Sequence, residues 1–477
     1  MSKTKVKEPA KVGYFFGEGY RDLWCTIASA WSKNIGDIKK AWADMFQKQS
    51  NVYATVCIFI YRLFMLVSIA VFGTLFTTVF TVLHVLGLAV VMLFVYLGFL
   101  LLRGVDALFC LFKGISNNCY NPGCERKFTL PVYICPHCGA QHRHLVPSKY
   151  GIFHRTCKCG AKLPTTFLNG RQKLESLCPH CGCKAIGGMH KSYLIPVVGG
   201  ANAGKTCFIT MAINEIENKA TSLGLSYEYQ YVQGDMFKDN MKRIESGECP
   251  QKTNDTAFKY YNFMLKPDTA KINNLVSVCD IAGEVFANQE ALGNQQGYRF
   301  ADAVMMVVDP LSVEEYRSEL KKNLPEAEFN ELNGSTQPMG DILSGLINTM
   351  ENMYRLKANQ TVNKTVVVVF TKCDIKGLDE KIGETAVKEY IASHPEAEIC
   401  EASNAVCEGF LKEYGEVNFV NTICNKFKSV QYFTCSALGH NATGEKFAPE
   451  NVETPLLWII DKMSQEINLD SVWGKKI

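Results

Sequence analysis

The sequence lacks any strong excess of charge. Its 477 residues carry 50 Lys and Arg against 47 Asp and Glu, a formal net charge of +3 at pH 7. This balance gives no global attraction toward nucleic acid or acidic partners. We expect no secretory signal either, because residues 1–50 are polar and hold no short apolar core before a cleavage site. Internal repeats and long low-complexity tracts are absent too, so the length predicts two or three ordinary domains.

Charged side chains are missing altogether from one long stretch. From Leu63 to Leu102 there is no Asp, Glu, Lys or Arg, and Arg62 and Arg103 bracket the run. A single transmembrane helix needs about 20 apolar residues, so the stretch is long enough for two. We therefore expect a transmembrane helical hairpin over residues 52–114. A buried hairpin in the core of a soluble domain is the alternative.

The position of the turn and the topology follow from the flanks. His84 interrupts the apolar run, so we expect the break near residues 81–87. A short turn would put both ends of the hairpin on one side of the membrane. Basic residues flank the stretch on both sides and favour the cytoplasm. The sequence thus predicts a two-pass membrane protein with both termini and the C-terminal domain in the cytoplasm.

Residues 1–50 predict an amphipathic N-terminal helix. Trp24, Trp31, Ile38 and Met45 recur every seven residues, whereas Lys33, Lys39 and Lys40 occupy other faces. Such a helix could lie on the membrane surface, pair with another helix, or pack on its own domain.

Cysteine is abundant, with 20 in the chain, but it is not scattered. Eight residues form four close pairs within residues 115–190: Cys119/Cys124, Cys135/Cys138, Cys157/Cys159 and Cys178/Cys181. Short cysteine pairs with Pro, His or Gly nearby are typical of zinc knuckles. Zinc takes four thiolate or imidazole ligands in a tetrahedron, so four pairs suit two closed structural sites. Thiolates of this kind favour a reducing compartment.

The assignment of pairs to sites is an interpretation. Cys135/Cys138 and Cys157/Cys159 are typical of the two knuckles of one zinc ribbon, which leaves Cys119/Cys124 to meet Cys178/Cys181. Other pairings are possible, and Cys183 is a spare ligand candidate. The zinc-ribbon-like domain is basic. A solvated or lipid-facing surface explains this charge better than nucleic-acid binding does.

Residues 191–477 alternate strand-like and helix-like runs, which is typical of an α/β domain. An apolar run ends at a GxxxxGK(S/T) loop, and a helix-like run follows, which is the context that a phosphate-binding loop requires. Backbone N–H groups of the loop would surround the phosphates. Lys205 would reach the β- and γ-phosphates, and the Thr206 hydroxyl would coordinate Mg²⁺. The loop consists of Gly199, Gly200, Ala201, Asn202, Ala203, Gly204, Lys205 and Thr206.

Two later segments would complete the phosphate side and read the base. Asp280 ends an apolar strand, where it could reach Mg²⁺ through water, and Gly283 could approach the γ-phosphate. The β-branched run 366–370 is typical of a buried parallel strand, and Thr371, Lys372 and Asp374 follow it in a TKxD pattern. The carboxylate of Asp374 can accept from the guanine N1–H and exocyclic amine, a donor pair that adenine lacks. Lys372 would brace the loop and cover the ring.

A fourth segment follows the strand 431–435. A backbone N–H in Ser436-Ala437-Leu438 could meet the guanine O6. Around these motifs we expect an antiparallel pair formed by 257–265 and 271–279, a strand at 303–308 and a closing helix at 454–467. Pro196 in the leading strand indicates a bulge there or an early strand start.

These four segments, in this order, resemble the Ras-like, translation-factor-related P-loop GTPases. Together with the upstream apolar stretch, the cysteine knuckles and the Asp280–Glu284 sequence, they resemble bacterial double-GTPase type domains. The resemblance implies a mostly parallel sheet with helices on both faces, and a ligand at the carboxyl ends of the strands. It also implies GTP or GDP and Mg²⁺ as ligands.

Two positions depart from the family pattern. Glu284 stands where the family has its water-positioning Gln, so it could orient water or act as a base, or leave hydrolysis slow and dependent on a partner. The switch threonine that completes Mg²⁺ coordination is Thr253 or Thr256, and we favour Thr253. We therefore expect Glu284, Lys205 and Thr253 to serve hydrolysis.

The resulting hypothesis is a membrane-anchored GTPase that acts as a nucleotide-dependent switch. Its expected partners are membrane lipid, guanine nucleotide and an unidentified protein effector. The alternatives are a membrane scaffold or sensor that binds nucleotide with little hydrolysis, and an ATP-dependent enzyme, against which Asp374 argues.

Overall fold

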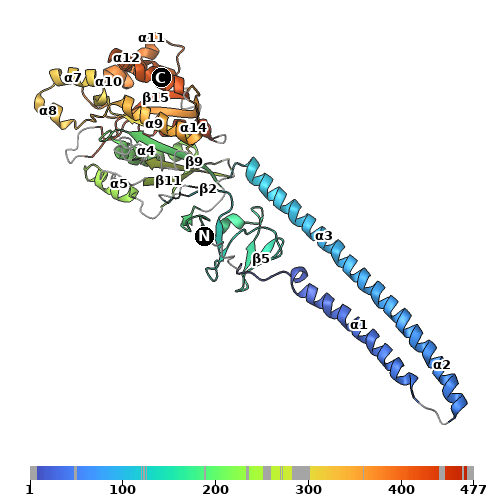
Figure 1. Ribbon diagram of the computed structural model, residues 1–477. Coiled ribbons are helices and arrows are strands. Elements are labelled where there is room, and N and C mark those ends of the chain that lie inside the picture. The colour runs from blue at the N-terminus through green and yellow to red at the C-terminus, as the bar shows by residue number, and fades with distance from the viewer. Residues whose placement is uncertain are drawn as a thin grey trace. The chain divides into compact units, whose positions relative to one another are not determined.

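The structure is a computed structural model that describes residues 8–47, 51–115, 117–119, 121, 124, 126–186, 190–231, 236–250, 259–268, 270, 272–281, 301–357, 359–439, 446–464 and 467–469. The chain forms two compact units (Figure 1). The first comprises Met1–Lys113 and Leu130–Pro179, and the second comprises Gly114–Thr129 and His180–Ile477.

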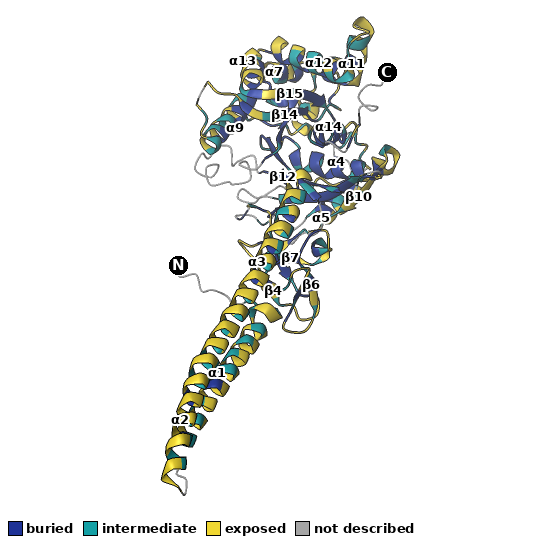
Figure 2. Ribbon diagram, turned by 90° about the vertical axis from the view of Figure 1, so that its right-hand side faces the viewer, coloured by how far each residue is buried: buried dark blue, intermediate teal, exposed yellow. Residues whose placement is uncertain are grey.

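Long helices dominate the first unit. A 3₁₀ turn, η1 (Tyr14–Phe16), precedes α1 (Glu18–Met45). Then α2 (Val52–Ser68), the π-helical turn η2 (Ile69–Gly73) and α3 (Thr74–Phe112) run on as one helix of 61 residues. Helix α1 lies alongside this long helix (Figures 1 and 2), where Trp31 Nε1 donates to Thr81 Oγ1 at 3.0 Å. Of the three placements open to the N-terminal helix, pairing with another helix is the one observed.

The turn predicted at residues 81–87 is wrong, because α3 continues through it. The polar side chains that indicated a break bond back to their own helix. Nδ1 of His84 lies 2.9 Å from the Phe80 carbonyl oxygen, and Thr81 Oγ1 donates to the Thr77 carbonyl at 2.8 Å. Since each finds a partner one turn earlier, none of them requires the helix to end. The two-pass hairpin within residues 52–114 therefore does not form.

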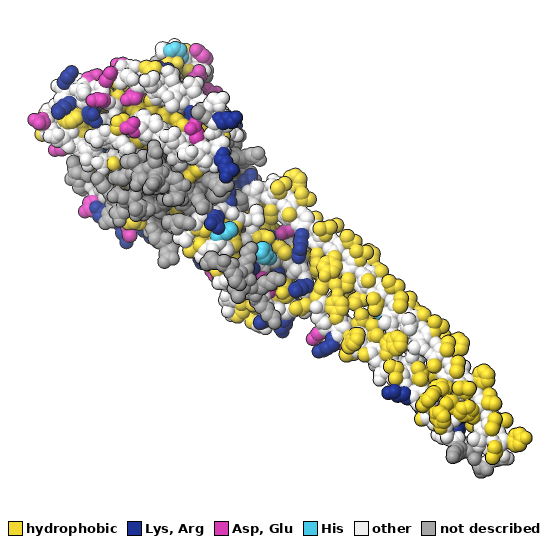
Figure 3. Space-filling view, in the orientation of Figure 1, with side chains coloured by type: hydrophobic (Ala, Val, Ile, Leu, Met, Phe, Trp, Pro, Cys, Tyr) yellow, Lys and Arg dark blue, Asp and Glu magenta, His cyan; other side chains and the backbone are white. Residues whose placement is uncertain are grey.

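The long helix has the composition of a membrane span. Residues Val52–Phe112 are long and apolar enough to cross a bilayer. Apolar side chains cover the face of the helix that Figure 3 shows. Most of the helix is exposed (Figure 2), and Phe76 and Leu100, for example, are 70% and 71% exposed. At about 1.5 Å per residue the helix is roughly 90 Å long, against about 30 Å for the hydrocarbon core of a bilayer.

Short strands complete the first unit. They are β3 (Val132–Ile134), β4 (Gln141–His142), β5 (His154–Thr156), β6 (Lys162–Pro164) and β7 (Ser176–Leu177), with the 3₁₀ turn η3 (Arg171–Lys173). Strand β3 pairs with β4 and β7, and β5 pairs with β6, all antiparallel. A buried ion pair between Arg171 and Asp106, 2.8 Å from Nη2 to Oδ2, fastens these strands to α3.

A seven-stranded mixed sheet forms the second unit, in the order β10-β11-β12-β9-β13-β14-β15. Its five strands from β12 to β15 are parallel, and β11 and β10 add antiparallel. The strands are β9 (His190–Gly199), β10 (Leu225–Tyr229), β11 (Lys259–Pro267), β12 (Asn273–Asp280), β13 (Ala303–Val308), β14 (Val362–Phe370) and β15 (Phe427–Thr434). The predicted antiparallel pair and the strand at 303–308 are therefore confirmed.

Helices cover both faces of this sheet because alternate strand residues point to opposite sides. Val366 and Val368 share a core with α9 and α12, whereas Val367 and Val369 share one with α4 and α14. The helices are α4 (Lys205–Ala220), α5 (Phe237–Glu245), α7 (Glu314–Asn323), α8 (Glu326–Glu331), α9 (Met339–Tyr354), α10 (Asp379–Ile382), α11 (Glu384–Ser393), α12 (Ile399–Glu413), α13 (Val417–Lys426) and α14 (Thr454–Met463), with 3₁₀ turns η4 (Thr221–Leu223) and η7 (Pro310–Ser312). Short strands β1 (Asn117–Asn118), β2 (Lys127–Phe128) and β8 (Lys184–Ala185) precede the sheet.

Pro196 lies within β9 without a bulge. The strand keeps one register against β12 from His190 to Val197, and its pairing with β13 starts at Val197. The strand starts at His190, so of the two options that the sequence left open, the early start is the observed one.

Candidate functional site

The phosphate loop connects β9 to α4 at the carboxyl edge of the sheet. Strand β9 ends at Gly199, α4 begins at Lys205, and Gly204 between them has φ +80°. A side chain at Gly204 would be strained in this left-handed conformation. The first amides of α4 therefore face the loop, and a helix N-terminus of this kind favours an anion.

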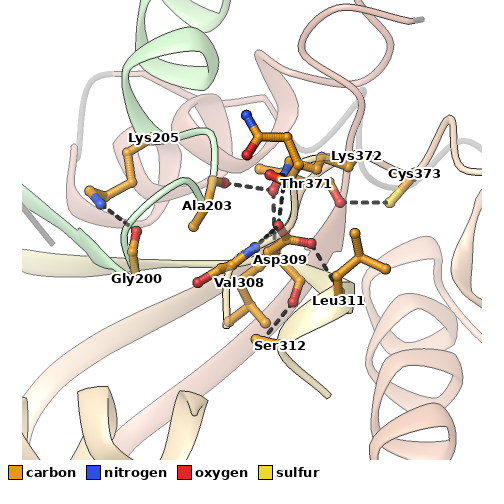
Figure 4. Close-up of polar contacts among 12 residues, drawn as sticks. Gly200, Ala203, Lys205, Val308, Asp309, Leu311, Ser312, Thr371, Lys372 and Cys373 are labelled. Atoms are coloured by element: carbon orange, nitrogen blue, oxygen red, sulfur yellow. Dashed lines mark hydrogen bonds and ion pairs between the residues drawn. The ribbon is translucent and has the colours of Figure 1, made fainter. Parts of the chain in front are cut away.

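Lys205 folds over the loop that precedes it. Its side chain is buried, and Nζ donates to the carbonyl oxygens of Gly199 at 2.9 Å and Gly200 at 2.8 Å (Figure 4). These bonds already order the Lys205 side chain at the loop. Less side-chain entropy is therefore lost when a ligand binds.

Two oxygen ligands meet beside the loop. Thr206 Oγ1 donates to Asp280 Oδ2 at 2.7 Å, although the residues lie 74 positions apart. Asp280 is the last residue of β12 and is fully buried, and Thr206 lies in the first turn of α4. A hydroxyl and a carboxylate at one point, next to a phosphate loop, form a donor set that suits Mg²⁺.

The loop after β14 contacts the phosphate loop directly. Thr371 Oγ1 donates to the Ala203 carbonyl at 2.8 Å, and its backbone N–H donates to the Val308 carbonyl at 3.0 Å (Figure 4). Lys372 has φ +57°, and its ammonium group forms an ion pair with Asp309 at 2.7 Å. The two loops predicted to hold phosphate and base therefore lie against each other.

Asp374 and Ser436 come together as the sequence pattern requires. Ser436 Oγ donates to Asp374 Oδ1 at 2.5 Å, and the Gly439 N–H donates to the same hydroxyl at 2.8 Å. The backbone of Cys373 also donates to the Cys435 carbonyl at 3.2 Å, and Ala437 is buried. The segment after β15 thus fixes the carboxylate that would read guanine.

A thiol pair lies beside the site and was not predicted. Cys207 follows Thr206 on α4, and its thiol is hydrogen-bonded to Cys249, which follows α5. This hydrogen bond, together with burial, raises the pKa of Cys207 well above its usual range. The same bond lowers the pKa of Cys249 to about 6. No spacing rule connects two cysteines 42 positions apart, so only the fold could reveal the pair.

Asp309 was also missed as a site residue. The sequence placed it at the end of a parallel strand, and the structure makes it the partner of Lys372. The available signal was an acidic residue at the carboxyl end of a buried strand, where ligands of such sheets gather.

Three predicted residues lie outside the described part of the chain. They are Gly283, Glu284 and Thr253, together with the alternative Thr256.

The eight paired cysteines form two groups. In each, the four sulfur atoms lie within 4.8 Å of one another: Cys135, Cys138, Cys157 and Cys159 in one group, and Cys119, Cys124, Cys178 and Cys181 in the other. A tetrahedron with Zn–S bonds of about 2.3 Å has S···S edges of about 3.8 Å. The distances of 3.7 Å for Cys135–Cys159 and 3.6 Å for Cys138–Cys157 fit such a site.

Comparison with known proteins agrees with the site geometry. Residues 193–408 match the family model of Double-GTPase 2. The matched range contains the phosphate loop, Asp280 and the Thr371–Asp374 segment. It indicates a P-loop domain of the double-GTPase type, which implies guanine-nucleotide binding and GTPase activity in general. No curated protein matches the chain.

Proposed function

We propose that this protein binds and hydrolyses GTP as a nucleotide-dependent switch associated with a membrane. The observation that supports it best is the hydrogen bond from Thr371 to Ala203, which joins the phosphate loop to the loop that carries Asp374. A nucleotide lying along this edge would have its phosphates at Lys205 and its base at Asp374. Both contacts would then belong to one preformed surface, which lowers the ordering cost of binding.

Guanine selectivity rests on Asp374 in this proposal. Its carboxylate would accept from N1–H and the exocyclic amine of guanine, and Ser436 would hold it in place. Adenine offers no such donor pair, so the wrong base would forgo both hydrogen bonds to the charged carboxylate. Thr371, Lys372 and Ala437 would complete the base site.

Thr206, Asp280 and Thr253 would hold Mg²⁺, Asp280 through water. The ion would supply charge neutralisation at the β- and γ-phosphates. Lys205 would place its ammonium group at the same phosphates and stabilise charge that develops during transfer to water. Gly283 would contribute a backbone N–H near the γ-phosphate.

Glu284 decides between two versions of the function. As a base or as an acceptor that orients water, it would serve hydrolysis within this chain. If it does neither, the protein is a nucleotide-binding membrane scaffold or sensor with little intrinsic hydrolysis, and an unidentified protein partner supplies the missing group. The scaffold or sensor function is supported by Glu284 itself, because it stands where the family has its water-positioning Gln.

The two cysteine groups would each bind one Zn²⁺ in a closed, structural site. Four thiolates leave no position for water, so we assign them no catalysis. Their role would be to fix short strands that share only a small apolar core.

The long helix α2–α3 would attach the chain to a lipid bilayer. Its exposed apolar side chains are unfavourable in water and are the kind of surface that lipid covers. We expect the full chain to sediment with membranes and to resist extraction by alkaline carbonate. Release into the supernatant would contradict this part of the proposal.

Turnover separates the switch from the sensor. The full chain, purified in detergent with Zn²⁺, would be assayed for GTP hydrolysis with Mg²⁺, alongside Glu284→Ala. We expect wild-type turnover that the substitution removes, with GTP binding retained. Tight GTP binding without wild-type turnover would support the sensor instead.

A further inference from the structure

Asp309 is a buried carboxylate that joins three separate segments. It is 1% exposed, and it follows β13 at the carboxyl edge of the sheet. Oδ1 accepts from the Leu311 N–H at 2.9 Å, whereas Oδ2 accepts from the Ser335 N–H at 2.8 Å and from Lys372 Nζ at 2.7 Å. A buried negative charge is tolerated only when it is paired and hydrogen-bonded in this way.

One arm of Asp309 fixes the base-reading loop. Lys372 has a left-handed backbone, which is unfavourable for a residue with a Cβ. Its ammonium group donates to Asp309 Oδ2, and also to the Asn333 carbonyl at 3.1 Å. Figure 4 shows Lys372 above Asp309. These bonds keep Lys372 in a conformation that the backbone alone would not favour, and Asp374 lies only two residues further on.

The other arm draws the segment before α9 onto the phosphate loop. With its N–H bound to Asp309, Ser335 lies so close to Gly200 that a Cβ at Gly200 would be 2.6 Å from Ser335 Oγ. That hydroxyl is buried and has no hydrogen-bond partner among the described residues. Gly200 is also the residue whose carbonyl accepts from Lys205. The segment thus forms a wall behind the phosphate loop.

We propose that Asp309 is a positioning residue of the nucleotide site. Through Lys372 it sets the loop that reads guanine, and through Ser335 it fixes the wall against which the phosphate loop is shaped. The inference rests on the proposed GTP-binding function. It adds the residue that positions the guanine-reading loop and the phosphate loop relative to each other. In this proposal Asp309 acts through Lys372 and Ser335 and makes no contact with the nucleotide.

Asp309→Asn tests the arm to the base loop, because it removes the charge that holds Lys372, whereas its amide oxygen can still accept from the Ser335 N–H. Binding to the full chain in detergent would be measured by displacement of a fluorescent GTP analogue with GTP and with ATP. We expect the GTP affinity to fall about tenfold or more, because a charge-assisted bond is lost, while the weak ATP affinity changes little. A merely structural role would lower both affinities together.

Asp302→Asn is the matched control. Asp302 lies at the other end of β13, where it likewise accepts from a backbone N–H, that of Leu194 at 2.9 Å, and pairs with Lys127 at 3.8 Å. We expect this variant to keep the wild-type preference for GTP. Unchanged preference in Asp309→Asn would overturn the positioning role and leave GTP binding intact. A wild type that binds GTP no better than ATP would overturn the proposed function, and the role of Asp309 with it.

A second pair of variants tests the arm to the phosphate loop even if Asp309→Asn fails to fold. Gly200→Ala should weaken GTP and ATP binding equally, because the new methyl group meets Ser335 Oγ. Adding Ser335→Gly removes that atom and should restore binding of both nucleotides. The coupling between the two changes measures the contact. Purely additive effects would contradict the wall assigned to Ser335.

Discussion

At the scale of single residues, the site depends on a few charged groups held by their neighbours. Lys205 bonds to the loop it serves, Asp374 is held by Ser436, and Asp309 holds Lys372. The first two could be predicted, because a phosphate-binding loop and a TKxD segment place them at fixed spacings. The partners of Asp309 and Cys249 could not be predicted, because only the fold brings Asp309 to Lys372 and Cys249, which follows α5, to Cys207 on α4.

Asp374→Asn should reduce the preference for GTP and spare the phosphate contacts. The substitution replaces one acceptor oxygen by an N–H₂ group, so the two guanine donors lose their paired acceptor. We expect a loss of GTP affinity of roughly 100-fold, the equivalent of about one hydrogen bond to a charged group. Competition binding with ATP checks it. An ATP affinity that falls in parallel would mean that Asp374 supports the fold rather than the base.

Cys249 should react as a thiolate at neutral pH. Its pKa of about 6 lies below the usual range because the Cys207 thiol donates to it, so the thiolate dominates above pH 6. This interaction stabilises the folded state above the unfolded thiol's pKa and is lost as the pH falls through 6. Alkylation followed by mass spectrometry should show a rate midpoint near pH 6.

Cys207→Ala is the informative comparison for this thiol. Removing the donor should move the alkylation midpoint of Cys249 up toward the usual thiol range, which we also expect for the urea-denatured chain. A midpoint that stays the same in the variant would contradict the hydrogen bond.

At the scale of elements, the strand predictions succeeded where an apolar run was continuous and had the length of a strand. Residues 303–308 and 366–370 are continuous apolar runs of strand length, and both are buried parallel strands. The prediction failed at residues 81–87, where polarity was taken to end a helix. Because His84 and Thr81 satisfy themselves on the preceding turn, the polar positions remain helical. The irregularity within the long helix is the π-helical turn at Ile69–Gly73. All of its residues are apolar, so no polar side chain predicts a turn there.

The contact between α3 and the cysteine-rich strands should depend on Asp106. This carboxylate accepts from the Phe167 N–H at 2.7 Å and pairs with the buried Arg171. Asp106→Asn leaves the guanidinium of Arg171 buried without its counter-ion, which should destabilise this contact by about 3–5 kcal/mol. Hydrogen exchange of residues 130–179 in the full chain should accelerate accordingly.

Asp22→Asn provides the comparison at an exposed site of the same unit, where the carboxylate accepts from the Tyr14 hydroxyl at 2.9 Å. Exchange in residues 130–179 should match the wild type in this variant. Equal protection in Asp106→Asn would show that the apolar contacts alone hold the strands on α3.

At the scale of the whole molecule, the chain combines an apolar helix, two cysteine groups and a nucleotide-binding sheet. The spacing predicts four cysteine pairs that each supply two ligands from one turn, but only the structure groups the pairs into two sets of four. The resemblance to P-loop GTPases implies a mostly parallel sheet with helices on both faces, whereas the strand order comes from the structure. The pairing of α1 with the long helix did not follow, since an amphipathic face fits a membrane, a helix or a domain equally well.

The number of zinc ions bound per chain tests the two cysteine groups. The full chain should contain two zinc ions, and Cys135→Ser should lower the number to one, because three thiolates bind zinc much more weakly than four. Atomic emission on the purified protein measures the metal content. Cys25→Ser, at an exposed free thiol on α1, should leave two ions. A wild-type chain that retains no zinc after purification in its presence would contradict the structural role.

The most direct test of the central claim is competition of GTP and ATP for the full chain in the presence of Mg²⁺. Wild type would be compared with Lys205→Ala, which removes the ammonium group at the phosphate loop, and with Lys388→Ala, which removes an exposed one paired with Glu384. We predict that the wild type and Lys388→Ala prefer GTP and that Lys205→Ala binds neither nucleotide. Equal affinity for GTP and ATP in the wild type, or full binding by Lys205→Ala, would contradict the account.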